Sequence, residues 1–103
     1  MTTFFIFGCY SQDSLKKINA QRTEEAVGLI ERFDGQVTAM YALLGQYDLV
    51  LIVQLPGNRE ALEASIGLTR ITGIDFITSP AFSVERFDQM IGNDLQKQMK
   101  NVV

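Results

Sequence analysis

The sequence predicts an α+β fold in which two helices cover one face of a four-stranded antiparallel sheet. Short runs rich in aromatic and β-branched residues alternate with segments whose apolar residues recur at helical spacing. Two of the short runs are separated only by Gly45-Gln46, a connection that forces an antiparallel hairpin. The length of 103 residues fits one domain with one hydrophobic core.

The N-terminal part predicts a strand followed by a helix. Residues 2–10 are dense in aromatic and β-branched residues and too short for a buried helix, so we expect a strand. In the polar segment that follows, Ser14 is placed to cap a short turn. Residues 22–33 carry apolar residues at helical spacing and two acidic residues in the expected first turn, which indicates a helix. Gly35 is suited to the left-handed conformation that ends such a helix.

Two β-rich runs and a second helix come next. Residues 36–44 and 47–55 predict the second and third strands, and Gly45 supplies the positive φ that their hairpin requires. Residues 58–71 then predict a second helix with Asn58 as its cap.

The C-terminal part predicts an edge strand, a short helix and a tail. Residues 74–82 read as the last strand, and Pro80 near its end indicates a sheet edge. Ser83 is placed to cap a short helix that Gly92 ends. Residues 92–103 then form a polar tail, whose apolar residues could either dock on a neighbouring subunit or fray: Leu95, Met99 and Val102.

The element order strand, helix, strand, strand, helix, strand is the βαββαβ arrangement of ferredoxin-like domains. We therefore expect residues 1–103 to form a single domain of this type. Successive strand residues point to opposite faces, and an antiparallel sheet with one solvated face should have one polar row.

Both rows are apolar in the first three expected strands. In the second strand, for example, we expect Val37, Ala39 and Tyr41 to share one face and Met40 to lie on the other. Because the second face is also apolar, we expect another surface to pack on it in place of water. A second copy of the chain would supply it, so we expect a homodimer or a higher homo-oligomer built as a dimeric α+β barrel.

Composition narrows the possible functions. Nine Lys and Arg against 12 Asp and Glu give a net charge of −3, so we expect no nucleic-acid or membrane partner. The absence of His excludes Ser-His and Cys-His catalysis within one chain, and we expect no metal and no cofactor. Cys9 has no second Cys to pair with, and no signal peptide or apolar span is present, so we expect a cytoplasmic protein.

Asp48 is the leading candidate site residue, because it is a carboxylate at the head of an otherwise apolar strand. It either accepts hydrogen bonds from turn amides and fixes the hairpin, or lies at a pocket rim as a base or ligand anchor, with its pKa raised by burial. Tyr47 faces the other side of the strand, so one pocket is not expected to use both. Gly45 is expected to be structural.

A second group of candidates lies near the end of the first expected strand. Tyr10, Tyr41 and the basic residues Lys16, Lys17 and Arg22 could line a pocket mouth and hold an anionic ligand. The plainer interpretation of the lysines is that they are solvated on a polar loop.

The Gly-Gln-Tyr-Asp motif at residues 45–48, followed by an apolar strand, resembles the GYD-domain family, which is named for a Gly-x-Tyr-Asp signature on its central hairpin. The resemblance continues through Tyr-Ser at 10–11, through Lys16 and through Ser-Val-Glu-Arg-Phe at 83–87, and it covers about residues 3–91. It implies a ferredoxin-like fold that oligomerises through its sheet. It implies no particular biochemical role.

We expect a protein that binds a small, partly apolar molecule between sheet and helices or between subunits. One alternative is a cofactor-free oxygenase- or isomerase-like enzyme of the dimeric α+β barrel type, in which Asp48 abstracts a proton. Tyr47, Tyr41 or Arg22 would then orient the substrate or stabilise an enolate. Another alternative is a structural or regulatory subunit without a ligand. The scarcity of catalytic side chains favours binding over catalysis.

Overall fold

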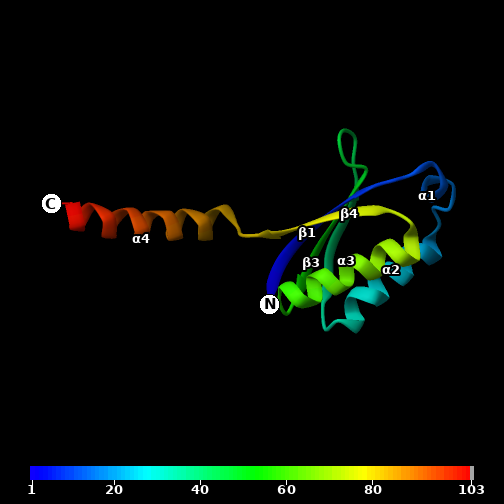
Figure 1. The fold of residues 1–103 in the computed structure, drawn as a ribbon, viewed down its shortest axis with the longest axis horizontal. Helices are drawn as coiled ribbons and strands as arrows, with labels where there is room; N and C mark the ends of the chain where they lie inside the picture. The colour runs from blue at the N-terminus through cyan, green and yellow to red at the C-terminus, as the bar shows by residue number, and fades with distance from the viewer. Residues whose placement is uncertain (103) are drawn as a thin grey trace.

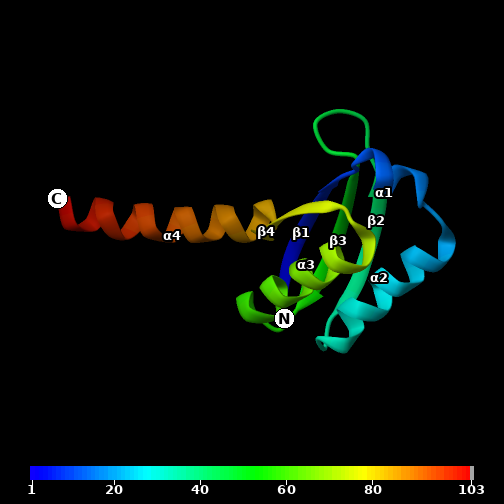
Figure 2. The same ribbon diagram turned by 45° about the vertical axis from the view of Figure 1, so that its right-hand side comes forward.

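Four strands form one antiparallel sheet in the order β2-β3-β1-β4. The computed structural model describes the backbone of residues 1–102 and the side chains of residues 1–93. Helices α2 and α3 lie together on one face of the sheet (Figures 1 and 2). The predicted α+β fold with βαββαβ order is confirmed, and β4 is an edge strand as Pro80 indicated. The strands are β1 (Thr2–Cys9), β2 (Gln36–Ala42), β3 (Leu49–Leu55) and β4 (Asp75–Ala81), and the two helices are α2 (Ala20–Arg32) and α3 (Asn58–Thr72).

The hydrophobic core lies between the sheet and these two helices. One row of side chains on each central strand is fully buried there, including Phe4 and Ile6 on β1 and Leu51 on β3. The small residues Ala61 and Ala64 let α3 approach the sheet closely. The helix-covered face is therefore complete within one chain.

The helix caps differ in detail from the predicted ones. A short helix, α1 (Gln12–Lys16), begins after Ser11, whose Oγ accepts a hydrogen bond from the Ser14 N–H at 3.0 Å. Ser14 Oγ accepts the Ser11 N–H at 2.7 Å in return, so Ser14 is the third residue of a capping box and not the cap. Asn19 caps α2, which starts two residues earlier than predicted. Gly57, not Asn58, occupies the cap position of α3.

The predicted tight hairpin at Gly45-Gln46 is wrong. β2 ends at Ala42 and β3 begins at Leu49, so residues 43–48 form a longer loop that projects from the domain (Figure 1). Its base is closed by the Leu43 N–H, which donates to the Asp48 carbonyl at 2.8 Å. Gly45 has a φ of 125°, so the need for a glycine there is confirmed.

A β-bulge changes which residues of β2 share a face. Val37 lies opposite Val53, whereas Ala39 lies opposite Ile52, so one extra residue is inserted between them. Val37 packs against the core and Ala39 lies on the opposite face with Tyr41. The prediction that Val37 shares a face with Ala39 is wrong, because the bulge interrupts the alternation.

The last helix, α4 (Val84–Val102), projects away from the sheet and the other helices (Figures 1 and 2). Ser83 Oγ accepts a hydrogen bond from the Arg86 N–H at 3.1 Å, which confirms the predicted cap. The helix continues through Gly92, so the prediction that Gly92 ends it is wrong. A glycine costs only about 1 kcal/mol in a helix, and the Gln, Lys and Leu residues that follow favour helix.

The predicted polar tail is therefore helical up to Val102. The apolar tail stripe of Leu95, Met99 and Val102 lies outside the residues whose side chains are described. Within the described part of the chain, no helix combines the length and the hydropathy needed to cross a bilayer.

Candidate functional site

The predicted site residues lie in separate places. Tyr10 and Arg22 line a cavity between the sheet and the helices. Tyr41 and Tyr47 lie on the other side of the sheet. Lys16 is exposed at the end of α1 and lines no part of that cavity.

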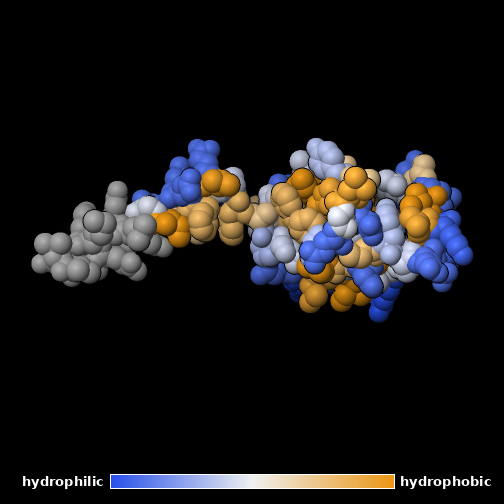
Figure 3. All heavy atoms as spheres, turned by 90° about the horizontal axis from the view of Figure 1, so that it is seen from above, coloured by the Kyte–Doolittle hydropathy of each residue, from blue (hydrophilic) through white to orange (hydrophobic). Residues whose placement is uncertain are grey.

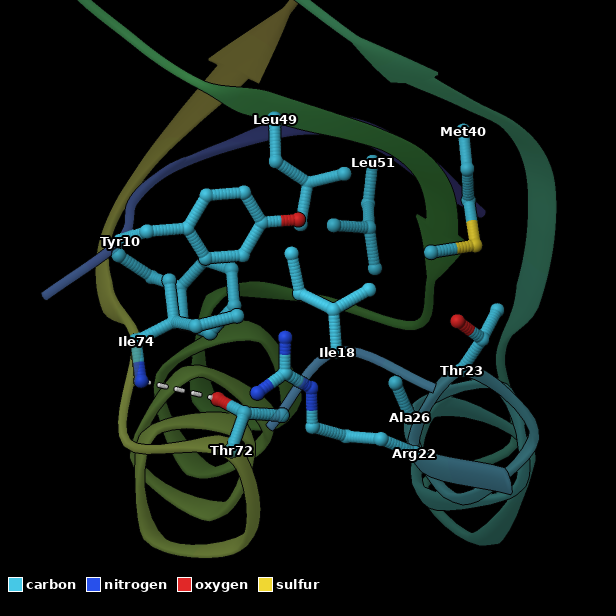
Figure 4. Close-up of a pocket in the computed structure, with 11 residues that line it drawn as sticks. Tyr10, Ile18, Arg22, Thr23, Ala26, Met40, Leu49, Leu51, Thr72 and Ile74 are labelled. Atoms are coloured by element: carbon cyan, nitrogen blue, oxygen red, sulfur yellow. Dashed lines mark hydrogen bonds between the residues drawn. The ribbon is translucent and has the colours of Figure 1, made fainter. Parts of the chain in front are cut away.

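The cavity, which we call the Tyr10–Arg22 cavity, has a volume of about 60 Å³. It opens where the end of β1 meets the start of α2 and the end of α3 (Figure 4). Most of its wall is apolar, and the phenol ring of Tyr10 crosses it with the hydroxyl pointing toward Leu49 (Figure 4). The apolar wall is formed mainly by Ile18, Met40, Leu49, Leu51, Ile74 and Phe76.

Arg22 supplies a positive charge at this cavity. The Asn19 cap starts α2, and Asn19 Oδ1 accepts the Arg22 N–H at 2.8 Å, which places Arg22 in the first turn. The half-buried guanidinium donates through Nη1 to the Ser14 carbonyl at 2.6 Å and lies 5.8 Å from the centroid of the Tyr10 ring. Among residues with described side chains, the sole ion pair is Arg59–Glu63, so no carboxylate neutralises Arg22.

Thr72 also lines the cavity, but its hydroxyl is already engaged. Oγ1 donates to the Leu68 carbonyl at 2.6 Å and accepts the Ile74 N–H at 3.1 Å, as the dashed line in Figure 4 shows for the second bond. Thr72 therefore ties the end of α3 to the segment that leads into β4. The polar groups that can meet a ligand are the Arg22 guanidinium, the Tyr10 hydroxyl and the Thr23 hydroxyl, whose bond to the Asn19 carbonyl is long at 3.5 Å.

Asp48 does not line the cavity. Its Oδ2 accepts the Tyr10 N–H at 2.9 Å, and its own N–H donates to the Gly8 carbonyl at 2.9 Å. The half-buried carboxylate thus binds backbone, which matches the structural alternative for this residue.

Tyr47 and Tyr41 belong to the face of the sheet that carries no helix. The ring of Tyr47 packs on Phe7 with 4.9 Å between the centroids, on the opposite side of the sheet from the cavity. Tyr41 is 58% exposed at the β2 edge. We call this surface the open face, and the strand register places on it Phe5, Phe7, Tyr41, Val50, Ile52 and Ile77.

Sequence reasoning missed most of the apolar cavity wall. Ile18 is the clearest case, because it is an apolar side chain in a polar segment and is half exposed even though it reaches the cavity. The signal available in the sequence was that Ile18 is an apolar residue with polar neighbours on both sides. Among the described residues, no cluster of three or more His, Cys, Asp or Glu side chains is placed to hold a metal.

Comparison with solved structures finds this fold in a regulatory protein. The leucine response regulatory protein of Mycobacterium tuberculosis matches with a TM-score of 0.53 and 11% identity, over 80% of this chain and 51% of that chain. The structure of a mutant protein matches with a TM-score of 0.53 and 12% identity, over 80% and 50% of the two chains. This chain therefore spans about half the length of those proteins, and the likeness shows the ferredoxin-like fold alone.

No curated protein matches the sequence. The sequence model of the GYD domain matches residues 4–91. That range contains the motif at 45–48, nearly the whole sheet and both helices that cover it. The chain therefore belongs to the GYD-domain family.

Proposed function

We propose that this protein is a cytoplasmic homo-oligomer that binds a small, partly apolar anion in the Tyr10–Arg22 cavity. The proposal depends on one observation: a half-buried guanidinium that has no carboxylate partner among the side chains of residues 1–93 lies at an apolar cavity. Ligand sites are typically apolar with a few convergent polar groups. A guanidinium pairs with carboxylates through two parallel hydrogen bonds, so a carboxylic acid is the simplest ligand class.

The cavity volume limits the size of the apolar part. About 60 Å³ is far below the ~300 Å³ at which pockets for drug-sized molecules begin. It exceeds the ~30 Å³ that one water molecule occupies in the liquid. The cavity therefore suits a short aliphatic group of a few carbons, with the carboxylate beside Arg22 at the cavity wall.

The name of one protein of similar fold guides the first compounds to test. That protein is named as a leucine response regulator. Leucine carries a carboxylate and a short branched chain, which is the chemistry that the cavity favours. We infer a ligand-responsive role of this general kind, with short carboxylic acids and amino acids as the ligands.

The open face supports the homo-oligomer. The largest contiguous apolar patch on a typical soluble monomer is about 300–600 Å² and often marks an interaction site. The face of four strands offers on the order of 300 Å² per subunit, and Tyr41 and Ile77 on it are 58% and 53% exposed. Hydrophobic atoms gather over the body of the domain in Figure 3. Two open faces packed together would form the dimeric α+β barrel.

The enzyme alternative has less support. It needs Asp48 as a base that faces the substrate, whereas the Asp48 carboxylate accepts the Tyr10 N–H and lies outside the cavity wall. No observation favours this alternative over ligand binding.

Ligand binding can be tested by the shift in Tm that short carboxylic acids and amino acids cause at millimolar concentration. A ligand at 100 times its Kd stabilises the folded state by about 2.7 kcal/mol, which raises Tm by several degrees. We expect the shift in the wild type to disappear in Arg22→Gln and to remain in Lys16→Gln, which removes an exposed cation away from the cavity. The shift is measured against each variant without ligand, so a lower starting Tm does not obscure it. No shift with any compound would count against the proposal.

A further inference from the structure

A second and larger groove lies beside the Tyr10–Arg22 cavity. It has a volume of about 320 Å³ and shares the side chains of Arg22 and Thr72 with the cavity. Figure 4 shows the Arg22 side chain reaching from α2 toward Thr72 at the end of α3, so Arg22 lies between the two spaces and lines both. We call the second space the outer groove. The rest of its lining consists of Lys17, Asn19, Gln21, Glu25 and Ile71.

The outer groove is mainly polar, whereas the cavity is mainly apolar. Two of its polar side chains are already engaged. The Thr72 hydroxyl bonds to backbone groups as donor and as acceptor. The side-chain amide of Asn19 accepts the Arg22 N–H at 2.8 Å and donates to the Lys17 carbonyl at 3.1 Å. The polar side chains that are left for a ligand are Lys17, Gln21, Arg22 and Glu25.

Arg22 and Glu25 place opposite charges next to each other in this groove. They are three residues apart on α2, so their Cβ atoms lie about 5–6 Å apart on one side of the helix. The two side chains do not pair with each other, because the ion pair found among the side chains of residues 1–93 is Arg59–Glu63. A guanidinium and a carboxylate therefore line the same groove, and both are available to a ligand.

We propose that the ligand is a zwitterionic α-amino acid with a short aliphatic side chain, which lies across Arg22 and occupies both spaces. Its side chain enters the Tyr10–Arg22 cavity, its carboxylate binds the Arg22 guanidinium, and its ammonium group faces Glu25. An α-amino acid carries both charges on one carbon, so it can meet two neighbouring side chains of opposite charge. This assignment rests on the function proposed above, since it takes Arg22 as the residue that binds the carboxylate.

The same arrangement disfavours a carboxylic acid that has no amino group. Its carboxylate at Arg22 would lie near the negative charge of Glu25, and the ligand would bring no positive group to offset the repulsion. An amine without a carboxylate would instead meet the two cations of the groove, Arg22 and Lys17. The zwitterion is the ligand class in which each charge meets an opposite one.

The proposal can be tested with two compounds that differ only in the amino group. Leucine and 4-methylpentanoate have the same carbon skeleton and the same carboxylate, and titration calorimetry at pH 7 measures the Kd of each. We expect the wild type to bind leucine more tightly. Glu25→Gln should weaken leucine binding about 2- to 5-fold, the range of an exposed ion pair, and should not weaken that of 4-methylpentanoate.

Glu24→Gln is the matched control. Glu24 is the preceding residue of α2, is also exposed, and lines neither the cavity nor the outer groove. The substitution removes the same charge from the chain, so it corrects for the change in net charge. The ratio of the two Kd values should stay as in the wild type.

The outcomes separate this proposal from the function on which it rests. If both compounds bind, Arg22→Gln abolishes binding of both, and Glu25→Gln leaves the ratio of their Kd values unchanged, the site takes carboxylates without recognising an ammonium group. That result would overturn the amino-acid assignment and leave the anion site in place. If neither compound binds, or if Arg22→Gln binds both as the wild type does, the anion site and the assignment are both wrong.

Discussion

The carboxylate of Asp48 holds the backbone of Tyr10, which lies 38 residues away in the sequence: Oδ2 accepts the Tyr10 N–H at 2.9 Å. The Asp48 N–H donates to Gly8, and its carbonyl accepts from Leu43, so this residue joins the end of β1 to the base of the 43–48 loop. Because Tyr10 lines the cavity and Asp48 does not, Asp48 holds a residue of the cavity wall from outside the cavity.

Replacing Asp48 should therefore lower stability. Asp48→Ala removes a charged acceptor and leaves the half-buried Tyr10 N–H without its partner, so we expect a loss of about 1.5–3 kcal/mol in the free energy of unfolding. Asp48→Asn keeps an acceptor oxygen and should lose less. Urea unfolding measures both.

The control is Asp75→Ala, which removes an exposed carboxylate and should change stability by less than about 0.5 kcal/mol. Equal effects at the two positions would contradict this role.

Gly45 and Gly28 should respond to alanine in opposite directions. Neither position has an atom within 4 Å of an added Cβ, so the steric space is the same. Gly45 has a φ of 125°, a conformation that L residues rarely adopt, and Gly45→Ala should cost about 1–3 kcal/mol. Gly28 lies inside α2, where alanine is the better helix former, and Gly28→Ala should stabilise by up to about 1 kcal/mol. Thermal unfolding of both variants checks the signs, and a stabilised Gly45→Ala would contradict the backbone argument.

The order of strands and helices could be predicted from the sequence, because the apolar periodicity that distinguishes a strand from a helix is a property of residues close together in the chain. Ser83 and Gly45 were assigned correctly. Ser14 and Asn58 do not occupy the cap positions, and the left-handed residue after α2 is Asp34, with a φ of 62°, and not Gly35. The tight hairpin was predicted wrongly because long-range hydrogen bonds to residues 8 and 10 hold Asp48 at the end of the loop. The Asp48 N–H bonds to Gly8, which no local pattern near the turn reveals.

A second limit of prediction from sequence concerns which side chains share a face of the sheet. Alternation assigns faces only while the register is regular, and the bulge between Val37 and Ala39 shifts it by one residue. The cavity shows a third limit, because Ile18 and Phe76 come from distant segments that only the tertiary fold brings together. Arg22 and Tyr10 were predicted from their place near the end of the first strand, and the structure brings them into contact.

A charge on the open face should break the face-to-face dimer. Ile77 is 53% exposed on β4, so Ile77→Lys leaves the core unchanged and places an ammonium where the second sheet would pack. We expect light scattering at micromolar concentration to report a lower mass than for the wild type. Leu15→Lys changes an equally exposed apolar residue on α1 and should keep the wild-type mass. A wild type that is itself a stable 11.5 kDa monomer would refute the dimer.

The Tyr10 hydroxyl should contribute to ligand affinity without contributing to the fold. It points into the cavity (Figure 4), while the ring keeps its contact with Arg22 in Tyr10→Phe. One hydrogen bond to a charged group contributes about 1.5–3 kcal/mol, so Tyr10→Phe should weaken binding of a short carboxylate ligand by a factor of about 12 to 160. Titration calorimetry measures the affinity, and urea unfolding should show stability within about 0.5 kcal/mol of the wild type. Tyr41→Phe removes a hydroxyl from the open face and should bind as the wild type does. If both variants bind equally well, the ligand does not reach the Tyr10 hydroxyl, and its carboxylate is held by Arg22 alone.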